Sequence, residues 1–439
     1  MYIPALLAFF VFLCVACNGS SGSSFSPVAP APTVTNPGSG GDTAGNTTDP
    51  APSPSPALES DEPKASTLTF PLGLTISRAD YLRKIGSDFA KRAASFQSAV
   101  TALNASTQAY CSAPTTESKI EAQNQWRQVM TLWQYFEVLQ IGPVGENAKT
   151  LKYSIYAWPD AANLCKVDEE ALKASKSSTY KLPPNNNRKG LQAIEYLLFE
   201  DSLLSRCAAG TAVATEWNAQ TIEVRNSTRC AYLKPLTAEI VNQSNVLVSK
   251  TGTEGDNFIG RVLGNAAAEQ DLIQAIYQAL FFVDLEVKNQ KISAPAGLGI
   301  AYCANSPLPC PEKAEFEFSD FSLKALDVNF TTFSDIIFGS ATGGRQGGLS
   351  ALLRASGESA AAERSEATAA KIGALVESHD GLNLNGLIVA KAQENCDVSS
   401  TSWICVARSS IRSIFVDLKA EYAKILQVKA PEAAAGDND

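Results

Sequence analysis

Three acidic residues occupy positions that the sequence predicts to be buried faces of helices. Glu195 lies in the stretch NNNRKGLQAIEYLLFED, where it shares a helical face with apolar residues one turn before and after it. Glu137 and Asp284 repeat the pattern on two other apolar stripes. A buried carboxylate is costly unless it meets a cation, a hydroxyl or backbone donor, a metal ion or an open cavity. These residues are therefore candidates for an internal polar site.

The acidic residues allow two interpretations. In the first, each reaches solvent at the edge of its stripe or pairs with an arginine such as Arg127 or Arg188. In the second, they converge on one cavity, as in helical bundles that build metal sites from glutamates and Glu-x-x-His pairs. The sequence contains a single histidine, His379, so a histidine-rich di-iron site or a Ser-His-Asp arrangement is not expected.

The elements that would position these residues are helices. Beyond residue 68 the apolar residues recur with helical spacing, and no strand-like alternation is long enough to start a sheet. Ser77 and Thr116 are the expected N-caps of the first two long helices. We predict an all-α fold of two antiparallel helical bundles, each with about four long helices.

Composition divides the chain into segments. Residues 18–67 are rich in Ser, Gly, Pro and Thr and hold too few large apolar side chains to fold, so a disordered tether is predicted. A first helical bundle is expected over residues 68–252 and a second over 253–430. The Ala/Gly/Asp-rich residues 431–439 are expected to form a flexible tail.

The first 17 residues resemble a bacterial lipoprotein signal. A short apolar run ends at a small residue followed by Cys17 and a Gly/Ser-rich stretch, which makes Cys17 the expected lipidation site. An ordinary cleaved signal peptide and an uncleaved anchor remain alternatives. Asn18 is not the Asp that retains such proteins in the inner membrane. The prediction is a lipid anchor in the outer membrane, with the folded part facing the periplasm.

Eight further cysteines predict disulfides, because exported proteins with an even number of cysteines usually pair them. Cys303 and Cys310, and likewise Cys396 and Cys405, are close in sequence and enclose predicted loops. Cys207–Cys230 is a weaker choice, and Cys111–Cys165 then follows by elimination. No CxxC spacing occurs, which disfavours a zinc site. The expected pairs are Cys303–Cys310, Cys396–Cys405, Cys207–Cys230 and Cys111–Cys165.

The formal net charge of −9 argues against a nucleic-acid partner, which would need a basic surface. An acidic protein of this kind is compatible with small molecules, cations and other proteins. The expected partners are thus the membrane, through the lipid anchor, and a metal or protein.

Three stretches resemble the imelysin-like family of bacterial periplasmic and outer-membrane proteins. They are QWRQVMTLWQYFEVLQIGPV (125–144), YAWPDAANL (156–164) and RKGLQAIEYLLF (188–199). The resemblance implies an all-helical fold of two bundle-like domains related by internal pseudo-symmetry. The family takes its name from a proposed metallopeptidase, and the resemblance also implies a link to iron acquisition.

The family's proposed site is a Gly-x-His-x-x-Glu motif, which here matches Gly190, Gln192 and Glu195. Gln192 replaces the histidine, and an amide oxygen is a weak ligand for zinc or iron compared with imidazole. A zinc peptidase also needs a full ligand set with an open position. The site therefore argues against peptidase activity. With Trp158 and Asp160 nearby, it suits a binding pocket better.

We therefore predict a non-catalytic envelope lipoprotein that binds a metal ion, a metal complex or a protein partner, in a role linked to iron uptake. Glu195 is the candidate metal ligand, and iron or another divalent metal is the candidate cofactor. Two alternatives remain: a metal-dependent peptidase with a carboxylate-rich site, and a structural surface lipoprotein. The residues proposed to line the site are Gly190, Gln192, Glu195, Glu137, Trp158, Asp160 and Asp284.

Overall fold

The computed structural model describes most of the chain beyond residue 74. The predicted signal peptide, Cys17 and the predicted tether lie outside the described residues, as do Cys303 and His379. The described residues are 75–160, 162–251, 257–298, 309–339, 347–375, 383–391, 396 and 400–435. Every regular element within these ranges is a helix, which confirms the predicted all-α fold.

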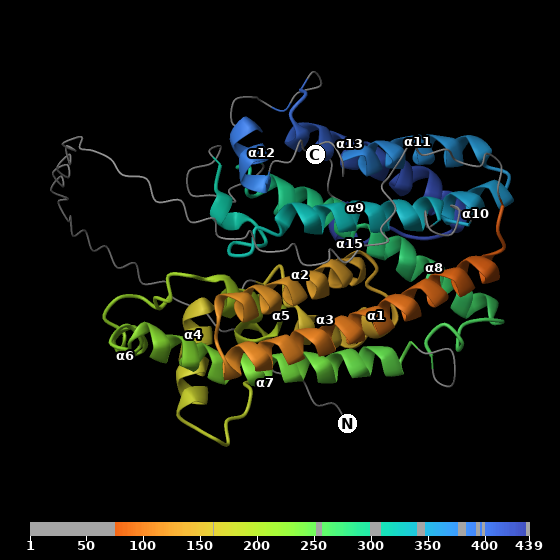
Figure 1. Ribbon diagram of the computed structural model, residues 1–439. Coiled ribbons are helices and arrows are strands. Elements are labelled where there is room, and N and C mark those ends of the chain that lie inside the picture. The colour runs from red at the N-terminus through yellow and green to blue at the C-terminus, as the bar shows by residue number, and fades with distance from the viewer. Residues whose placement is uncertain are drawn as a thin grey trace, which may run out of the picture. The chain divides into compact units, whose positions relative to one another are not determined.

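A first group of helices is built around three long ones that pack side by side (Figure 1). These are α1 (Arg78–Ser112), α2 (Thr116–Val138) and α7 (Ile222–Ser249). α5 (Gly190–Phe199) packs against α2 and α7, and α4 (Leu164–Ser175) packs against α7. Apolar residues three and four apart on α1 and α2 meet in an aromatic core. It includes Phe89, Phe96, Trp126, Trp133 and Phe136.

Helix caps explain where the first two helices begin. The Ser77 side chain accepts a hydrogen bond from the Asp80 backbone N–H, as the sequence predicts for an N-cap. In α2 the cap is Thr115, one residue before the predicted Thr116. Thr115 and Ser118 exchange side chain-to-backbone hydrogen bonds in a capping box, and this reciprocal pair selects the earlier start.

A second group of helices follows in the chain. α9 (Ser322–Phe338), α11 (Ser359–Leu375) and α13 (Trp403–Asp417) run side by side (Figure 1). α8 (Ala266–Leu280) leads into the π-helix η4 (Val283–Ser293), which packs against α9 and α13. α2 of the first group packs against α9 of the second, so side chains from both groups meet in the interior.

Short elements complete the described part of the chain. Ala434, in the segment where the sequence suggested a tail, is buried. The remaining elements are η1 (Gly142–Val144), η2 (Asn147–Lys149), α3 (Thr150–Ile155), η3 (Asn186–Arg188), α6 (Ala212–Asn218), η5 (Pro311–Lys313), α10 (Leu349–Ala355), α12 (Leu384–Lys391), η7 (Leu418–Tyr422), α14 (Ala423–Leu426) and α15 (Glu432–Ala435).

The disulfides differ from the predicted pairs in two cases. The structure contains Cys111–Cys230, Cys165–Cys207 and Cys396–Cys405. The last confirms a prediction, whereas Cys207–Cys230 and Cys111–Cys165 are wrong. The reason is that α1 and α7 run antiparallel, which brings the end of α1 to the first turns of α7. The predicted partner of Cys310, Cys303, lies outside the described residues.

Within the described ranges, no helix combines the length and the apolar character needed to cross a bilayer.

Candidate functional site

Lys291 lies at the centre of a buried polar cluster. Its Nζ donates to Gln134 Oε1 at 2.8 Å and to Asn329 Oδ1 at 3.0 Å, and lies 2.9 Å from Glu315 Oε2. An ammonium group has three N–H donors, and here three oxygens surround it. These side chains come from η4, α2, α9 and the loop after η5. The cluster thus joins segments that are far apart in sequence.

Glu137 is fully buried and lies between two lysines of this cluster. Its Oε1 is 3.5 Å from Lys152 Nζ, and its Oε2 is 3.6 Å from Lys291 Nζ. Lys152 also donates to the carbonyl of Trp158 at 2.6 Å, just before the cis Trp158–Pro159 bond. Two cations therefore compensate a charge that would be very unfavourable alone in the core.

Glu315 connects the cluster to the aromatic residue Tyr156. The Tyr156 hydroxyl donates to Glu315 Oε1 at 2.9 Å. Burial raises the pKa of the Glu315 carboxyl, and the adjacent Lys291 opposes that shift. Lys291 Nζ also lies 4.9 Å from the centre of the Trp158 ring, so the cation is enclosed by both carboxylates and an aromatic face.

Glu195 is buried and held by the segment that precedes α9. Its Oε1 accepts hydrogen bonds from Phe318 N at 3.3 Å, Ser319 N at 3.1 Å and Ser319 Oγ at 2.7 Å. Burial raises the pKa of Glu195 to about 8, against the lowering effect of these hydrogen bonds, and the nearby Glu315 adds to the rise. At neutral pH this carboxyl is therefore mostly protonated.

The protonation of Glu195 predicts a pH-dependent stability. A free carboxyl titrates near 4.5 and Glu195 near 8, so between these values the native state holds a proton that the unfolded chain has lost. Stability from this group falls as pH rises through that range, by at most about 1.4 kcal/mol per pH unit. Glu195→Gln, which mimics the protonated acid, should lack this slope. Thermal unfolding from about pH 5 to 8.5 tests it, and parallel curves for the two proteins would contradict the assignment.

Gly190 allows α5 to begin close to another backbone segment. Its φ is +80°, and a Cβ at this position would lie 2.7 Å from the Ile155 carbonyl oxygen. We expect Gly190→Ala to lower the free energy of unfolding by about 2–3 kcal/mol. Gly210→Ala is the matched control, because Gly210 has φ +83° but open space around it. If both variants lost the same free energy of unfolding in chemical denaturation, the close approach to Ile155 would not contribute to the cost of a side chain at position 190.

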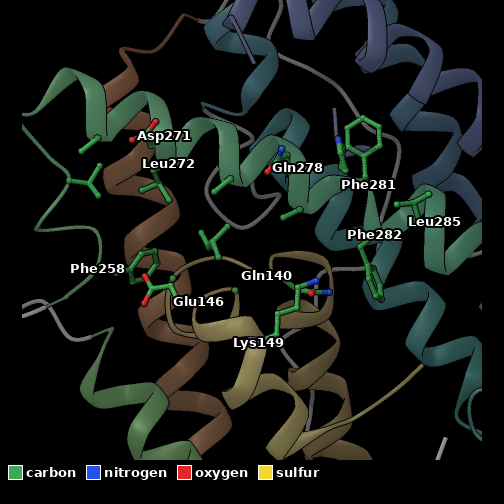
Figure 2. A pocket seen from close by; sticks show the side chains of 18 of the residues that line it. Gln140, Glu146, Lys149, Phe258, Asp271, Leu272, Gln278, Phe281, Phe282 and Leu285 are labelled. Atoms are coloured by element: carbon green, nitrogen blue, oxygen red, sulfur yellow. The ribbon is translucent and has the colours of Figure 1, made fainter. Parts of the chain in front are cut away.

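A cavity of about 640 Å³ lies beside the cluster. Figure 2 shows the α8 side chains Asp271, Leu272 and Gln278 across from Phe258 and Glu146. The ring of a further lining residue, Phe282, is 5.2 Å from Lys291 Nζ. Phe282 therefore contacts both the cavity and the buried cation. The charged lining residues are Glu146, Lys149, Arg261, Asp271 and Glu286.

Lys149 and Glu286 are half-buried residues of opposite charge that line this cavity. Burial raises the pKa of Glu286 to about 7, and Lys149 and Lys152 oppose the shift. Burial also lowers the pKa of Lys149, an effect that the charge of Lys152 reinforces. Among the described residues neither Lys149 nor Glu286 has an ion pair within 4 Å. Both groups are therefore available to a ligand.

Some of the residues singled out by the sequence lie in or near the cluster. Glu137 belongs to it, Trp158 contacts Lys291, and Glu195 lies near Glu315. Glu137 and Trp158 contact both Lys152 and Lys291, and Glu195 accepts hydrogen bonds from Phe318 and Ser319, so residues before and after position 283 build the site together. Gln192 is buried, and its Oε1 has no hydrogen-bond partner in the described part of the chain.

Two predicted site residues lie elsewhere. Asp160 is exposed, so the prediction that it lines an internal site is wrong. The Trp158–Pro159 turn places it at the surface. Asp284 is buried, but its carboxylate lies 2.8 Å from Lys288 Nζ and 3.4 Å from Lys419 Nζ. It therefore belongs to a separate ion-pair group that links the two π-helices, η4 and η7.

Sequence reasoning did not select Lys291, Lys152, Glu315 or Asn329. Asn329 offered a signal, because it interrupts the apolar stripe of α9 in the same way that Glu137 interrupts that of α2. The sequence gave a weaker signal for Lys291, because η4 is a π-helix and its wider turns do not follow the 3.6-residue period of an α-helix. Of the charged residues of the cluster, the apolar stripes therefore identified Glu137 alone.

The described residues do not fit a metal ion at Glu195. Nowhere in the described ranges do three His, Cys, Asp or Glu side chains gather closely enough to hold one. Glu195 Oε1 instead accepts three protein donors, and the neighbouring Glu315 is bound by Lys291 and Tyr156. Backbone N–H, hydroxyl and ammonium groups thus occupy the carboxylate oxygens that a metal ion would need.

The fold and the site together define an all-helical protein with a buried charge cluster beside a ligand-sized cavity. The family model for imelysin, Peptidase M75, matches residues 90–400, so the chain belongs to the imelysin family. No curated protein matches the chain.

Two solved structures share this fold. One is an imelysin-like protein from Psychrobacter arcticum 273-4, with 13% identity and a TM-score of 0.59 over 82% of this chain and 99% of that one. The other, from Parabacteroides distasonis ATCC 8503, is described as a proposed iron-regulated protein A precursor. It has 16% identity and a TM-score of 0.57 over 82% of this chain and 97% of that one. At these identities the likeness concerns the fold.

Proposed function

We propose that this imelysin-family protein is a non-catalytic binding protein of the bacterial cell envelope. Its ligand is a small organic molecule, or a metal held within an organic shell, that occupies the cavity lined by α8, η4 and residues 140–149. The observation that carries the proposal is the cavity itself, because its volume of about 640 Å³ falls within the range of small-molecule sites. Its walls combine apolar side chains with a few charged groups, as such sites do.

The state of the motif supports binding rather than hydrolysis. Gln192 stands where the family motif has histidine, and Glu195 accepts hydrogen bonds from Phe318 and Ser319. A metallopeptidase needs a metal with an open coordination position and a base to activate water. Proteolysis that a chelator abolishes, and that Glu195→Gln also abolishes, would support a peptidase instead.

The envelope location rests on the N-terminal sequence. The apolar run and Cys17 followed by a Gly/Ser-rich stretch are typical of a lipoprotein signal. We propose a lipid anchor at Cys17 in the outer membrane and a folded part that faces the periplasm. Labelling cells with a radioactive or clickable fatty acid tests this, with Cys17→Ser as the control that must lose the label.

A role in iron uptake is a narrower proposal. The description of the Parabacteroides distasonis structure names iron regulation for that protein, and a chelated iron would meet the cavity through its organic shell rather than through protein ligands. Thermal unfolding with ferric citrate, citrate alone and ferric ion alone separates these cases. Stabilisation by ferric ion alone would favour direct metal binding and contradict the proposed mode.

Cavity binding can be tested with a pair of substitutions on one helix. Ala275 lines the cavity and Ala267 is exposed, so Ala275→Trp should fill the site while Ala267→Trp leaves it open. Native mass spectrometry of protein purified from its host should detect a bound small molecule in the wild type and in Ala267→Trp only. An equal ligand content in both variants, or none in any of the three proteins, would remove the proposal.

A further inference from the structure

We propose that the cavity selects an amphipathic anion, an apolar body with one carboxylate-like group, and that Lys149 binds the anionic group. The inference rests on the proposed binding function and specifies its ligand class. It depends on the backbone at Lys149, on the pairing of the neighbouring charges and on the apolar walls of the cavity.

The backbone that carries Lys149 has an unusual conformation. Asn147, Ala148 and Lys149 have φ values of 50°, 51° and 57°, so three successive residues with side chains adopt the left-handed region. Such a run is unfavourable for L-residues, and conformations of this kind concentrate at functional sites. The turn is held by the Lys149 N–H, which donates to the Glu146 carbonyl, and by the start of α3. It places the lysine at the cavity wall.

The neighbouring lysines differ from Lys149 in their partners. Lys152 lies near Glu137 and Lys291 near Glu315, whereas Lys149 has no ion pair or side-chain hydrogen bond to any described residue. A half-buried cation without a partner gains most from an incoming anion, which would restore the interactions that burial removes.

The acidic residue whose charge acts most strongly on Lys149 is Glu286, and it favours the same ligand. Glu286, on the η4 side of the cavity, interacts with Lys149, and burial raises its pKa to about 7. Near neutral pH a large fraction of this carboxyl carries a proton, which it can donate to an anionic oxygen. Glu146 and Asp271 line other parts of the cavity, toward Phe258 and on α8 (Figure 2).

The remaining walls suit an apolar body. Phe258, Leu272, Phe281, Phe282 and Leu285 line the cavity together with alanines of α8. Apolar walls stabilise a ligand in proportion to the apolar area that is buried, and this effect has no preferred direction. The walls would therefore accept an alkyl or aromatic group of suitable length. The anionic group, bound by Lys149, would then set the orientation of the ligand.

Calorimetric titration with three probes of the same chain length tests the inference: decanoate, decanol and decylamine, each below its micelle concentration. We expect decanoate to bind best and decanol at least about tenfold more weakly. Lys149→Met should weaken decanoate binding about tenfold and leave decanol unchanged, and Lys149→Arg should retain binding. Lys84→Met is the matched control, because Lys84 is a half-buried lysine of α1 outside this cavity.

The possible failures are distinguishable. Tightest binding by decylamine, or decanoate binding that Lys149→Met leaves intact, would overturn the inference. If Ala275→Trp still abolished that binding, the proposed function would survive. No binding by any of the three probes would overturn the inference, and the absence of a native ligand by mass spectrometry would remove the proposed function as well.

Discussion

Replacing Lys291 with methionine is expected to lower the free energy of unfolding by about 3–5 kcal/mol. Methionine keeps most of the volume of lysine but removes the ammonium group that contacts Gln134, Asn329 and Glu315. Glu137 would also lose one of its two cations. Gln134 Oε1 would keep the donor on the Asn329 side-chain amide, but Asn329 Oδ1 and Glu315 Oε2 would lose the ammonium group that they contact in the core. Leaving buried oxygens unsatisfied in this way is costly.

Urea denaturation at neutral pH measures this loss. Lys119→Met is the control, because Lys119 pairs with Asp201 at the surface, where the Asp201 side chain is 82% exposed, and removing such a pair costs less than about 1 kcal/mol. Losses of similar size for the two variants would mean that Lys291 does not stabilise the cluster. Adding Glu315→Gln to Lys291→Met should recover part of the loss, since one buried negative charge is then gone.

Removal of the Cys111–Cys230 disulfide is expected to have a comparable effect. The bond closes a loop with a sequence separation of 119 residues, and for a loop of this size the chain-entropy relation gives about 4–5 kcal/mol. Double substitution by alanine should therefore shift the urea midpoint strongly. The physical reason is that the unfolded chain regains the freedom that this long closure had removed.

The short disulfide Cys396–Cys405 provides the comparison. Its sequence separation is 9, so its removal should cost about 2–3 kcal/mol by the same relation. A larger loss for the short loop would contradict the expected order. Peptide mapping of the unreduced protein checks the connectivity directly, because a peptide pair joining Cys207 to Cys230 would restore the pairing predicted from sequence.

Much of the fold follows from local sequence patterns. Helical spacing of apolar residues predicted the all-α class, and Ser77 was correctly identified as a cap. The same spacing placed Glu137 and Glu195 in the interior, because the face on which a side chain lies depends only on its position along its own helix. The family motif at residues 190–195 was likewise readable without coordinates.

Only the tertiary structure decided which of these groups meet. Lys291 and Gln134 are 157 residues apart, and no local pattern encodes that contact. The cysteine pairs changed partners for the same reason, since the antiparallel packing of α1 and α7 brings Cys111 to Cys230. Spacing along a helix determines which side chains turn inward. The docking of separate helices determines whether an inward charge meets a metal, a cavity or, as for Glu137, two lysines.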